Sequence, residues 1–336
     1  MKLQDREDKV CGYLVPHLKE YVFDELSENY LEKAGVLDIL KDVPIPIKKT
    51  EMTSLNTLAI ARNMAFIMGC DPAFEYSQNY IDYILRTFDK NFTLSLINEG
   101  VEAAAARDYD CACINFRAAL MLDPDSTDAL YCYGRACKDS YEIGEEESYV
   151  ARYKAESIEV FEELTMVKPD FDMGFYFLGY GYLNLGLYIK AKLTWDSFME
   201  LATDEELKRE IQGRLDVLDD PIEIEKGYNL VLSGKYNEGI EKLSPYMEGV
   251  FSDWWPLWYY LGIAHKELGH SDEAIEYLTK VLQYSPSNID TMENLVEIYQ
   301  VAGDNEKVEK YTNKIQVIKE NIEKDKLQQE LNSKVN

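Results

Sequence analysis

The sequence predicts an all-α protein built from helical hairpins, and three observations support this fold class. Only 10 prolines and 18 glycines occur among 336 residues, too few for a turn-rich β fold. Hydrophobic residues make up 46% of the chain, which is enough for one large core or a long array of small cores. Two tracts, 93–126 and 255–288, place small residues and a closing proline at the same internal positions. We therefore expect a repeated helical unit.

The clearest unit is WPLWYYLGIAHKELGHSDEAIEYLTKVLQYSPSN at 255–288. Trp258 stands at repeat position 4, followed by Leu261-Gly262, by Ala274 at position 20 and by Pro286 at position 32. This pattern resembles the tetratricopeptide repeat (TPR), a helical hairpin of about 34 residues. The resemblance implies a right-handed superhelical TPR solenoid, in which the first helix of each hairpin (helix A) lines the concave side and the second (helix B) lies outside it.

The same frame predicts about six repeats over residues 93–322. They lie near 93–126, 127–171 with an insertion around EIGEEESYVARYKAE, 172–219 with an extra helix DEELKREIQGRLDVL, 220–254, 255–288 and 289–322. Small residues at positions 8 and 20 allow helices A and B to approach closely where they cross, and large apolar residues at positions 4, 7, 11 and 24 fill the surrounding space. Glycine near position 15 permits the tight turn, and proline at position 32 stops helix B. Because one hairpin cannot bury both of its faces, neighbouring hairpins must stack.

The two ends of the chain depart from this pattern. Residues 1–92 are expected to form an N-terminal helical cap, helical over VCGYLVPHLKEYVFDELSENYLEKAG, extended at DVPIPIKK, and with one degenerate repeat at 55–90. The cap is expected to cover an apolar face of the first repeat, formed by Leu94, Ile97, Val101, Ala104 and Ala105. Residues 323–336 are expected to continue as a polar helix extension, since an array needs a terminal cap with a polar outer face.

The net charge of −27 comes from 62 acidic and 35 basic residues. Such a surface repels phosphate backbones and anionic lipids, so neither nucleic acid nor a membrane is an expected partner. Solubility explains the charge most simply, and a basic partner is the sharper interpretation. The charged N-terminal stretch MKLQDREDKV is unlike a signal peptide, and six cysteines occur without a CxxC pair. We therefore expect a cytoplasmic protein with reduced thiols.

The strongest catalytic pattern is HKELGH at 265–270. A zinc-protease helix needs two histidines four residues apart with a glutamate beside the first. His265 and His270 are five apart, and Lys266 replaces the glutamate. His265 falls at position 11, a packing position, and His270 falls in the turn. No phosphate loop, dinucleotide fingerprint or nucleophile elbow occurs, so we expect no enzyme activity, cofactor or metal.

In TPR proteins positions 2, 5, 9 and 12 of helix A, and often 6 and 13, face the groove. These positions predict an aromatic and aliphatic peptide-binding stripe with cations at its edges, because tyrosine offers rigid contact area and one hydroxyl. Its members are Tyr131, Arg135, Lys138, Tyr176, Tyr180, Tyr228, Tyr259, Ile263 and Lys266. The alternative is that each tyrosine only packs against a neighbouring helix. The carboxylate clamp that some family members use for chaperone tails is absent, since Pro221 and Glu225 occupy two of its positions.

The sequence therefore predicts a non-enzymatic scaffold that binds a protein or peptide in its concave groove, with a partner that is basic or rich in aromatic residues. The alternative is a peptide-controlled regulatory protein with a helical effector domain before the repeats. This alternative rests on the layout of the chain alone.

Overall fold

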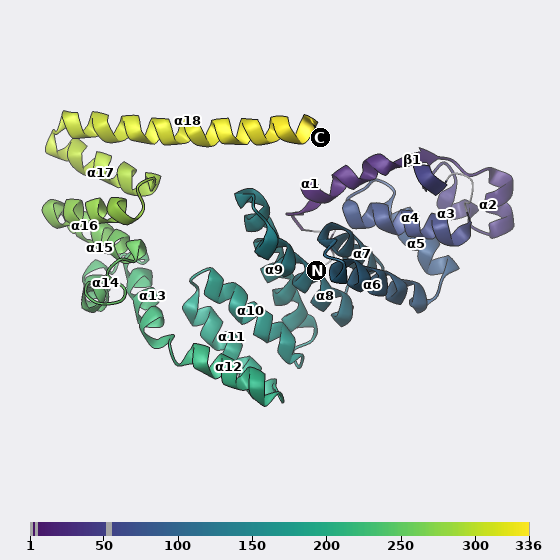
Figure 1. Cartoon of the computed structure of the whole chain (residues 1–336), viewed down its shortest axis with the longest axis horizontal. Coiled ribbons are helices and arrows are strands. Elements are labelled where there is room, and N and C mark those ends of the chain that lie inside the picture. Colours follow the sequence, from purple (N-terminus) through teal and green to yellow (C-terminus); the bar gives the residue numbers. More distant parts are fainter. Residues whose placement is uncertain (1–2, 4–5, 52–55, 336) are drawn as a thin grey trace. The chain divides into compact units, whose positions relative to one another are not determined.

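The structure is a computed structural model that describes residue 3 and residues 6–51 and 56–335, with the side chains of these residues as far as Lys324 except that of Glu51. The chain divides into two compact units, Met1–Ile211 and Gln212–Asn336, and each is described by itself. Helices dominate the described part of both units, which confirms the all-α class (Figure 1). No helix in the described part of the chain is both long and apolar enough to cross a membrane.

The first unit begins with short elements and continues as helical pairs. The short elements are α1 (Cys11–Leu14), β1 (Tyr21–Asp24), α2 (Glu28–Ala34), α3 (Leu37–Leu40) and β2 (Ile45–Lys48), with 3-10 helices at Val15–Glu20 and Lys49–Glu51. The long helices are α4 (Thr57–Cys70), α5 (Ser77–Thr87), α6 (Lys90–Ala105), α7 (Tyr109–Leu122), α8 (Thr127–Ile143), α9 (Glu147–Val167), α10 (Asp172–Asn184), α11 (Tyr188–Leu201) and α12 (Glu205–Leu215), the last of which crosses the boundary between the units.

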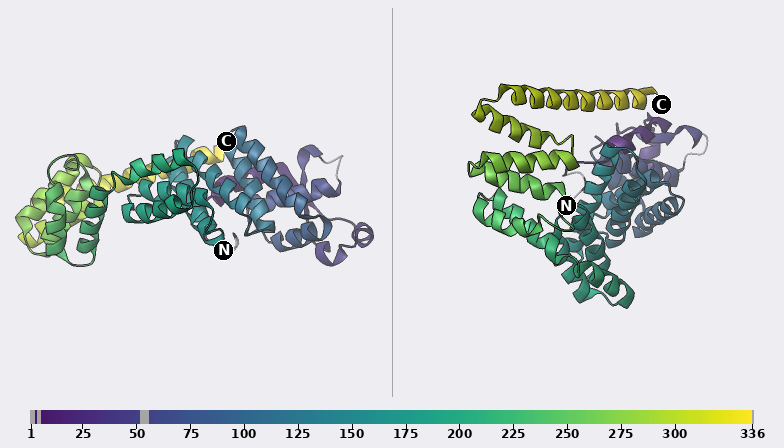
Figure 2. Two further views of the ribbon diagram at one scale, coloured as in Figure 1. Left: turned by 90° about the horizontal axis from the view of Figure 1, so that it is seen from below. Right: turned by 60° about the vertical axis from the view of Figure 1, so that its left-hand side comes forward.

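The second unit consists of three further hairpins. They are formed by α13 (Asp219–Leu232) with α14 (Tyr236–Leu243), α15 (Trp255–Glu267) with α16 (Ser271–Tyr284), and α17 (Ile289–Ala302) with α18 (Asn305–Val335). A 3-10 helix at Ser244–Tyr246 follows α14. Further views show the helices of these hairpins side by side (Figure 2). Helix α18 continues without a break from the last predicted repeat into the C-terminal segment.

Helix pairs cross where the sequence places position 8. A Cβ added there would lie only 2.2–2.8 Å from a side chain of the paired helix, so only a hydrogen fits. The glycines at these crossings are Gly100, Gly134, Gly179, Gly227 and Gly262, which face Phe116, Phe161, Trp195, Leu243 and Leu278. The close crossing of helices A and B is therefore built by the residue types that the repeat frame predicts.

The turn between paired helices falls at position 15 in five of the repeats. There the backbone adopts a left-handed conformation, with φ of 63° at Arg107, 72° at Gly186, 78° at Gly234, 79° at Gly269 and 73° at Gly303. A residue with a Cβ is strained in this region, which explains why glycine occupies four of the five positions. The second repeat lacks this turn because α8 runs on to Ile143, and most of the predicted insertion becomes part of the long helix α9.

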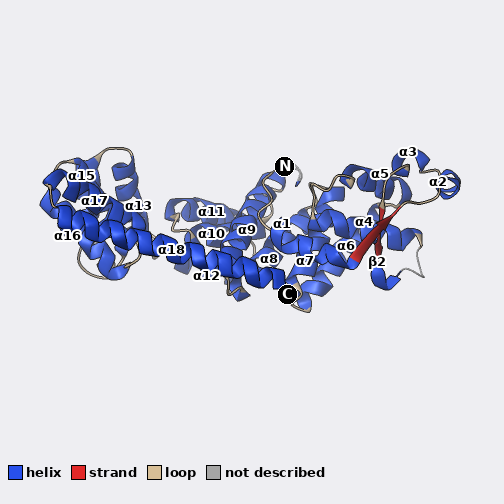
Figure 3. Ribbon diagram, turned by 90° about the horizontal axis from the view of Figure 1, so that it is seen from above, coloured by secondary structure: helices blue, strands red, loops and turns tan. Residues whose placement is uncertain are grey.

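One element of the N-terminal segment differs from the sequence-based expectation. The stretch expected to be helical contains β1, which pairs antiparallel with β2, with Tyr21 opposite Lys48 and Asp24 opposite Ile45 (Figure 3). The extended conformation expected at DVPIPIKK is confirmed by β2. Pairing with a partner more than twenty residues away satisfies the backbone of Tyr21–Asp24, and this tertiary contact outweighs the local helical preference.

The prediction that the N-terminal segment covers the apolar face of the first repeat fails at Leu94, Val101 and Ala105, whereas Ile97 is buried. Leu94 and Val101 on α6 remain 50% and 47% exposed, and Ala105 is also exposed. The segment instead packs α4 against α7, where Gly69 lies directly on the backbone of Ile114. It therefore extends the stack on the side of helix B and leaves this part of helix A open.

A polar strap at residues 6–9 joins the N-terminus to this stack. Arg117 on α7 is fully buried and binds the Asp8 carboxylate through both terminal nitrogens. Arg6, whose side chain is 4% exposed, pairs with Glu156 on α9, which is 1% exposed. Tyr133 donates a hydrogen bond to Glu156 at 2.8 Å and accepts one from Arg117 at 3.2 Å. Residues 6–9 therefore share one buried polar network with α7, α8 and α9.

Candidate functional site

The predicted groove residues fall into two groups, one in each unit. Tyr131, Arg135 and Lys138 lie on α8 and Tyr176 and Tyr180 on α10; we call these five the α8–α10 cluster. Tyr228 lies on α13, and Tyr259, Ile263 and Lys266 lie on α15; we call these four the α13–α15 cluster. All nine lie on the first helix of a hairpin. Each cluster is considered within its own unit.

Arg135 and Tyr131 form the exposed edge of the α8–α10 cluster. The Tyr131 ring packs edge-on against Phe171, with ring centroids 5.3 Å apart. The Arg135 guanidinium lies 5.8 Å from the centroid of the Tyr131 ring and 5.6 Å from that of Phe177. Arg135 is exposed, and no carboxylate of the described residues is within ion-pairing distance of it. A cation is thus held over two rings with its charge available to an incoming carboxylate.

Lys138 is occupied within its own helix. Its ammonium group lies 2.5 Å from the Glu142 carboxylate, one helical turn along α8, and 4.0 Å from Asp139. Exposed pairs of this kind contribute little to stability and exchange readily. Lys138 therefore contributes less free positive charge than its position in the stripe predicts.

Tyr176 and Tyr180 share one acceptor on α12. Both hydroxyls donate to the Glu210 carboxylate, with Tyr176 at 3.1 Å from Oε1. The two rings meet edge to face at 5.2 Å, and Tyr180 packs edge-on against Trp195 at 5.0 Å. Burial, and next the neighbouring Tyr180, raise the pKa of the Tyr176 hydroxyl, so it stays protonated as a donor. Both rings are half-buried and pack against neighbouring rings, and their hydroxyls bind the exposed carboxylate of Glu210.

Sequence reasoning missed Glu210. The stretch DEELKREIQGRLDVL was predicted as an extra helix, but nothing in it indicated which carboxylate would reach α10. Only the fold brings residue 210 beside residues 176 and 180.

The α13–α15 cluster centres on two stacked rings. Tyr228 and Tyr260 stack with centroids 4.7 Å apart and planes 19° apart, and Tyr259 meets Tyr260 edge-on at 5.4 Å. Burial raises the pKa of the Tyr259 hydroxyl. Tyr260 links Tyr228 to Tyr259. Four half-buried residues, these three tyrosines and Ile263, thus form a continuous aromatic and aliphatic surface over α13 and α15.

Lys266 at the end of this surface is tied to the next hairpin. Its Nζ donates to Asn294 Oδ1 at 2.7 Å and pairs with Glu297, both on α17. Lys266 therefore links α15 to α17, and its charge is compensated.

The histidine pair of HKELGH lies apart from this surface. The Nδ1 atoms of His265 and His270 are 3.4 Å apart, and His265 packs against the Tyr277 ring at 5.3 Å. Burial is the main cause that lowers the pKa of His265, and Glu273 opposes it. Within the described part of the chain, no group of three or more histidine, cysteine, aspartate or glutamate side chains is arranged to hold a metal. At the turn between α15 and α16 the two histidine rings contact each other, and His265 contacts Tyr277.

Trp258, the most conspicuous residue of the same tract, is structural as predicted. It is 2% exposed, and its indole N–H donates to the Ser252 carbonyl at 2.6 Å. The ammonium group of Lys280 on α16 lies 3.3 Å from the ring centroid.

Comparison with known proteins matches residues 255–288 to the family model described as "Tetratricopeptide repeat". Among solved structures, the chain is similar to the "P58(IPK) TPR Domain", with 14% identity over 90% of this chain and 87% of that one and a TM-score of 0.47. It is similar to the MamA protein, with 16% identity over 69% and 94% and a TM-score of 0.26. It is also similar to YrrB, described as "a TPR protein with an unusual peptide-binding site", with 18% identity over 59% and 89% and a TM-score of 0.31. No curated protein matches the chain.

Proposed function

We propose that this chain, a tetratricopeptide-repeat protein, is a non-enzymatic scaffold that binds a protein or peptide segment on the first helices of its hairpins. The single observation that carries the proposal is the pair of half-buried aromatic clusters on those helices. Their rings are already held by ring–ring contacts, so a partner would order few side chains on binding. Preorganised aromatic surface of this kind is typical of protein-binding hot spots.

The charges around the rings indicate the chemistry of the partner. Glu210 offers an exposed carboxylate beside Tyr176 and Tyr180, and the chain as a whole carries a net charge of −27. A basic partner segment would be attracted by this field and could pair with Glu210. Arg135 at the edge of the same cluster suits one acidic or aromatic residue of that segment. We therefore favour a predominantly basic partner segment with aromatic residues.

The alternative, a regulator with an effector domain before the repeats, is less well supported. The N-terminal residues Val10, Leu14 and Leu31 belong to the same apolar core as Tyr133 on α8 and Phe161 on α9. An effector domain that acts separately from the repeats would need its own core and an exposed linker. The shared core favours a cap over an effector.

The test is capture of protein partners from the native host, quantified by mass spectrometry. Arg135→Glu together with Glu210→Lys inverts the charge at the exposed edge of the α8–α10 cluster and the charge of the carboxylate bound by its two tyrosines, without emptying any core position. The matched control is Lys33→Glu, an exposed lysine on α2 with no ion pair among the described residues. The proposal predicts that specific partners are lost with the double variant and retained with the control. Circular dichroism checks that all three proteins are equally helical.

A second variant addresses the α13–α15 cluster. Tyr260→Ala removes the ring that links Tyr228 to Tyr259, and Tyr284→Ala, at an exposed position on α16, is its matched control. Undiminished capture by both the charge-inverted variant and Tyr260→Ala would contradict binding on these helix faces.

A further inference from the structure

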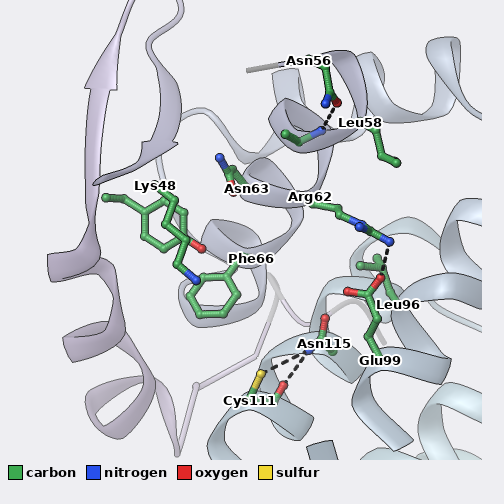
Figure 4. A pocket seen from close by; sticks show the side chains of 12 residues that line it. Lys48, Asn56, Leu58, Arg62, Asn63, Phe66, Leu96, Glu99, Cys111 and Asn115 are labelled. Carbon is green, nitrogen blue, oxygen red and sulfur yellow. Dashed lines mark hydrogen bonds and ion pairs between the residues drawn. The ribbon is translucent and has the colours of Figure 1, made fainter. Parts of the chain in front are cut away.

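A cavity in the first unit is separate from both aromatic clusters and plays no part in the function proposed above. It has a volume of about 520 Å³ and lies between the β-ribbon and helices α4, α6 and α7. Figure 4 shows Lys48 and Phe66 on one side and Arg62 with Glu99 on the other, with Asn63 and Asn115 between them. A volume of this size is that of a small-molecule site.

The cavity carries positive charge in an acidic protein. Arg62 forms an ion pair of 2.8 Å with Glu99, which compensates its charge. Lys48 is half-buried, and no carboxylate of the described residues is within ion-pairing distance of its Nζ. The lining side chains Lys48, Arg62 and Glu99 therefore sum to +1 in a chain with a net charge of −27. A partly desolvated cation without a partner favours an anion in the adjacent space.

One wall of the cavity is flat and apolar. The rings of Tyr21 and Phe66 stack with centroids 5.3 Å apart and planes 28° apart, and Leu58 and Leu96 contribute aliphatic surface to the lining. Aromatic rings presented in this way bind other flat rings by offset stacking. The cavity thus combines an unpaired cation with a surface for a ring.

Fixed amide groups complete the lining. Asn63 Nδ2 donates to the Pro46 carbonyl at 3.2 Å, which ties α4 to β2. Asn115 Nδ2 donates to the Cys111 carbonyl at 2.9 Å, as the dashed line in Figure 4 marks. Both amides are held by hydrogen bonds to backbone, so each presents its remaining polar capacity in one orientation. Pockets with a few fixed polar groups on an apolar wall are typical of specific ligand sites.

We propose that this cavity binds a small organic anion that carries a flat ring. Its negative group pairs with Lys48, and its ring lies against Tyr21 and Phe66. The ion pair of Arg62 with Glu99 forms the opposite side and offers a donor and an acceptor to polar substituents of the ligand.

The first experiment measures charge dependence with two fluorescent probes of similar shape. The anion 8-anilinonaphthalene-1-sulfonate has the proposed chemistry, and N-phenyl-1-naphthylamine is its uncharged analogue. Lys48→Gln should weaken binding of the anion roughly tenfold, the effect of losing one charge-assisted hydrogen bond, and leave binding of the neutral probe nearly unchanged. Lys19→Gln, on an exposed lysine of the segment Val15–Glu20, should change neither.

The second experiment places the probe in the cavity. Cys111 lines the cavity, whereas Cys132 on α8 does not. Saturating 8-anilinonaphthalene-1-sulfonate should slow the alkylation of Cys111 by N-ethylmaleimide, measured by mass spectrometry of peptides, and leave the rate at Cys132 unchanged. Melting curves by circular dichroism check that every variant is folded. Equal affinity of wild type and Lys48→Gln for the anion, or equal alkylation of Cys111 with and without it, would overturn the proposal.

Discussion

Among the aspartates and glutamates of the N-terminal segment, Asp8 is the one whose replacement by alanine should destabilise the first unit most. The reason is Arg117, which is fully buried on α7. Its Nε donates to the Gly69 carbonyl at 2.7 Å, and its Nη1 lies 3.0 Å from Asp8 Oδ1 and 3.2 Å from the Tyr133 hydroxyl. Asp8→Ala removes the acceptor of Nη2 and one of the two acceptors of Nη1, and leaves the positive charge inside the protein.

The expected cost follows from the burial. Breaking a buried ion pair by removing one partner costs about 3–5 kcal/mol, because the remaining charge is uncompensated. Asp8→Asn keeps one acceptor oxygen and should cost about half as much. The matched control is Asp38→Ala, which breaks the 2.7 Å pair with Arg86 on an exposed surface and should change stability far less.

Hydrogen exchange read by mass spectrometry measures this effect unit by unit. A loss of about 3 kcal/mol raises the opening equilibrium of α7, α8 and α9 by about two orders of magnitude. Peptides from α16 and α17 in the second unit serve as the internal reference. If Asp8→Ala and Asp38→Ala changed protection equally, or if Asp8→Ala left α7 and α9 unaffected, the buried network would not hold residues 6–9 to these helices.

Three further predictions concern the repeat geometry and the strap. Gly179→Ala should lower the melting temperature, because its Cβ would lie 2.2 Å from Trp195 Nε1, whereas Gly213→Ala on α12 meets nothing within 4 Å and should be neutral or stabilising. Arg107→Gly should raise thermal stability, because the left-handed conformation costs a residue with a Cβ about 1–2 kcal/mol, a gain reduced by the extra chain entropy of glycine in the unfolded state. Burial would raise the pKa of the Asp8 carboxyl, but the hydrogen bond and charge of Arg117 hold this pKa below its ordinary value of 3.8. The stability that the ionised carboxylate contributes is therefore present above pH 3.8 and is lost as the pH falls through the lowered pKa. Denaturant titration against pH should show this loss in wild type and not in Asp8→Asn.

The hairpins were predictable because each depends on residues close together in sequence. A glycine at position 8 and a large residue at position 24 must meet if both helices form, so Gly262 and Leu278 indicate a crossing from the sequence alone. The left-handed turn at Gly269 is equally local. The second repeat departed from the frame because α8 and α9 are both longer than the frame predicts. Such lengthening requires no residue type that the repeat pattern excludes, so the pattern does not reveal it.

The candidate site was predictable only by position. Helix periodicity places Tyr176 and Tyr180 on one side of α10, but it does not show that Glu210 meets both hydroxyls. In the same way, the sequence predicts Lys266 as a cation of the groove, and only the fold brings Asn294 and Glu297 on α17 into contact with it. Contacts between a long lysine side chain and a carboxylate on another helix depend on tertiary packing, which the local sequence does not encode.

The attachment of the N-terminal segment has the same non-local origin, and its chemistry has a consequence for specificity. The close approach of Gly69 to the Ile114 backbone already restricts how α4 can sit on α7. Arg117 reaches both the Gly69 carbonyl at the end of α4 and the Asp8 carboxylate, so one side chain sets the position of two separate segments. A shift of either segment would leave a buried charge or a buried carbonyl without its partner. The network therefore stabilises one register against the alternatives, and the register of α4 on α7 in turn places Arg62 across the cavity from Lys48 (Figure 4).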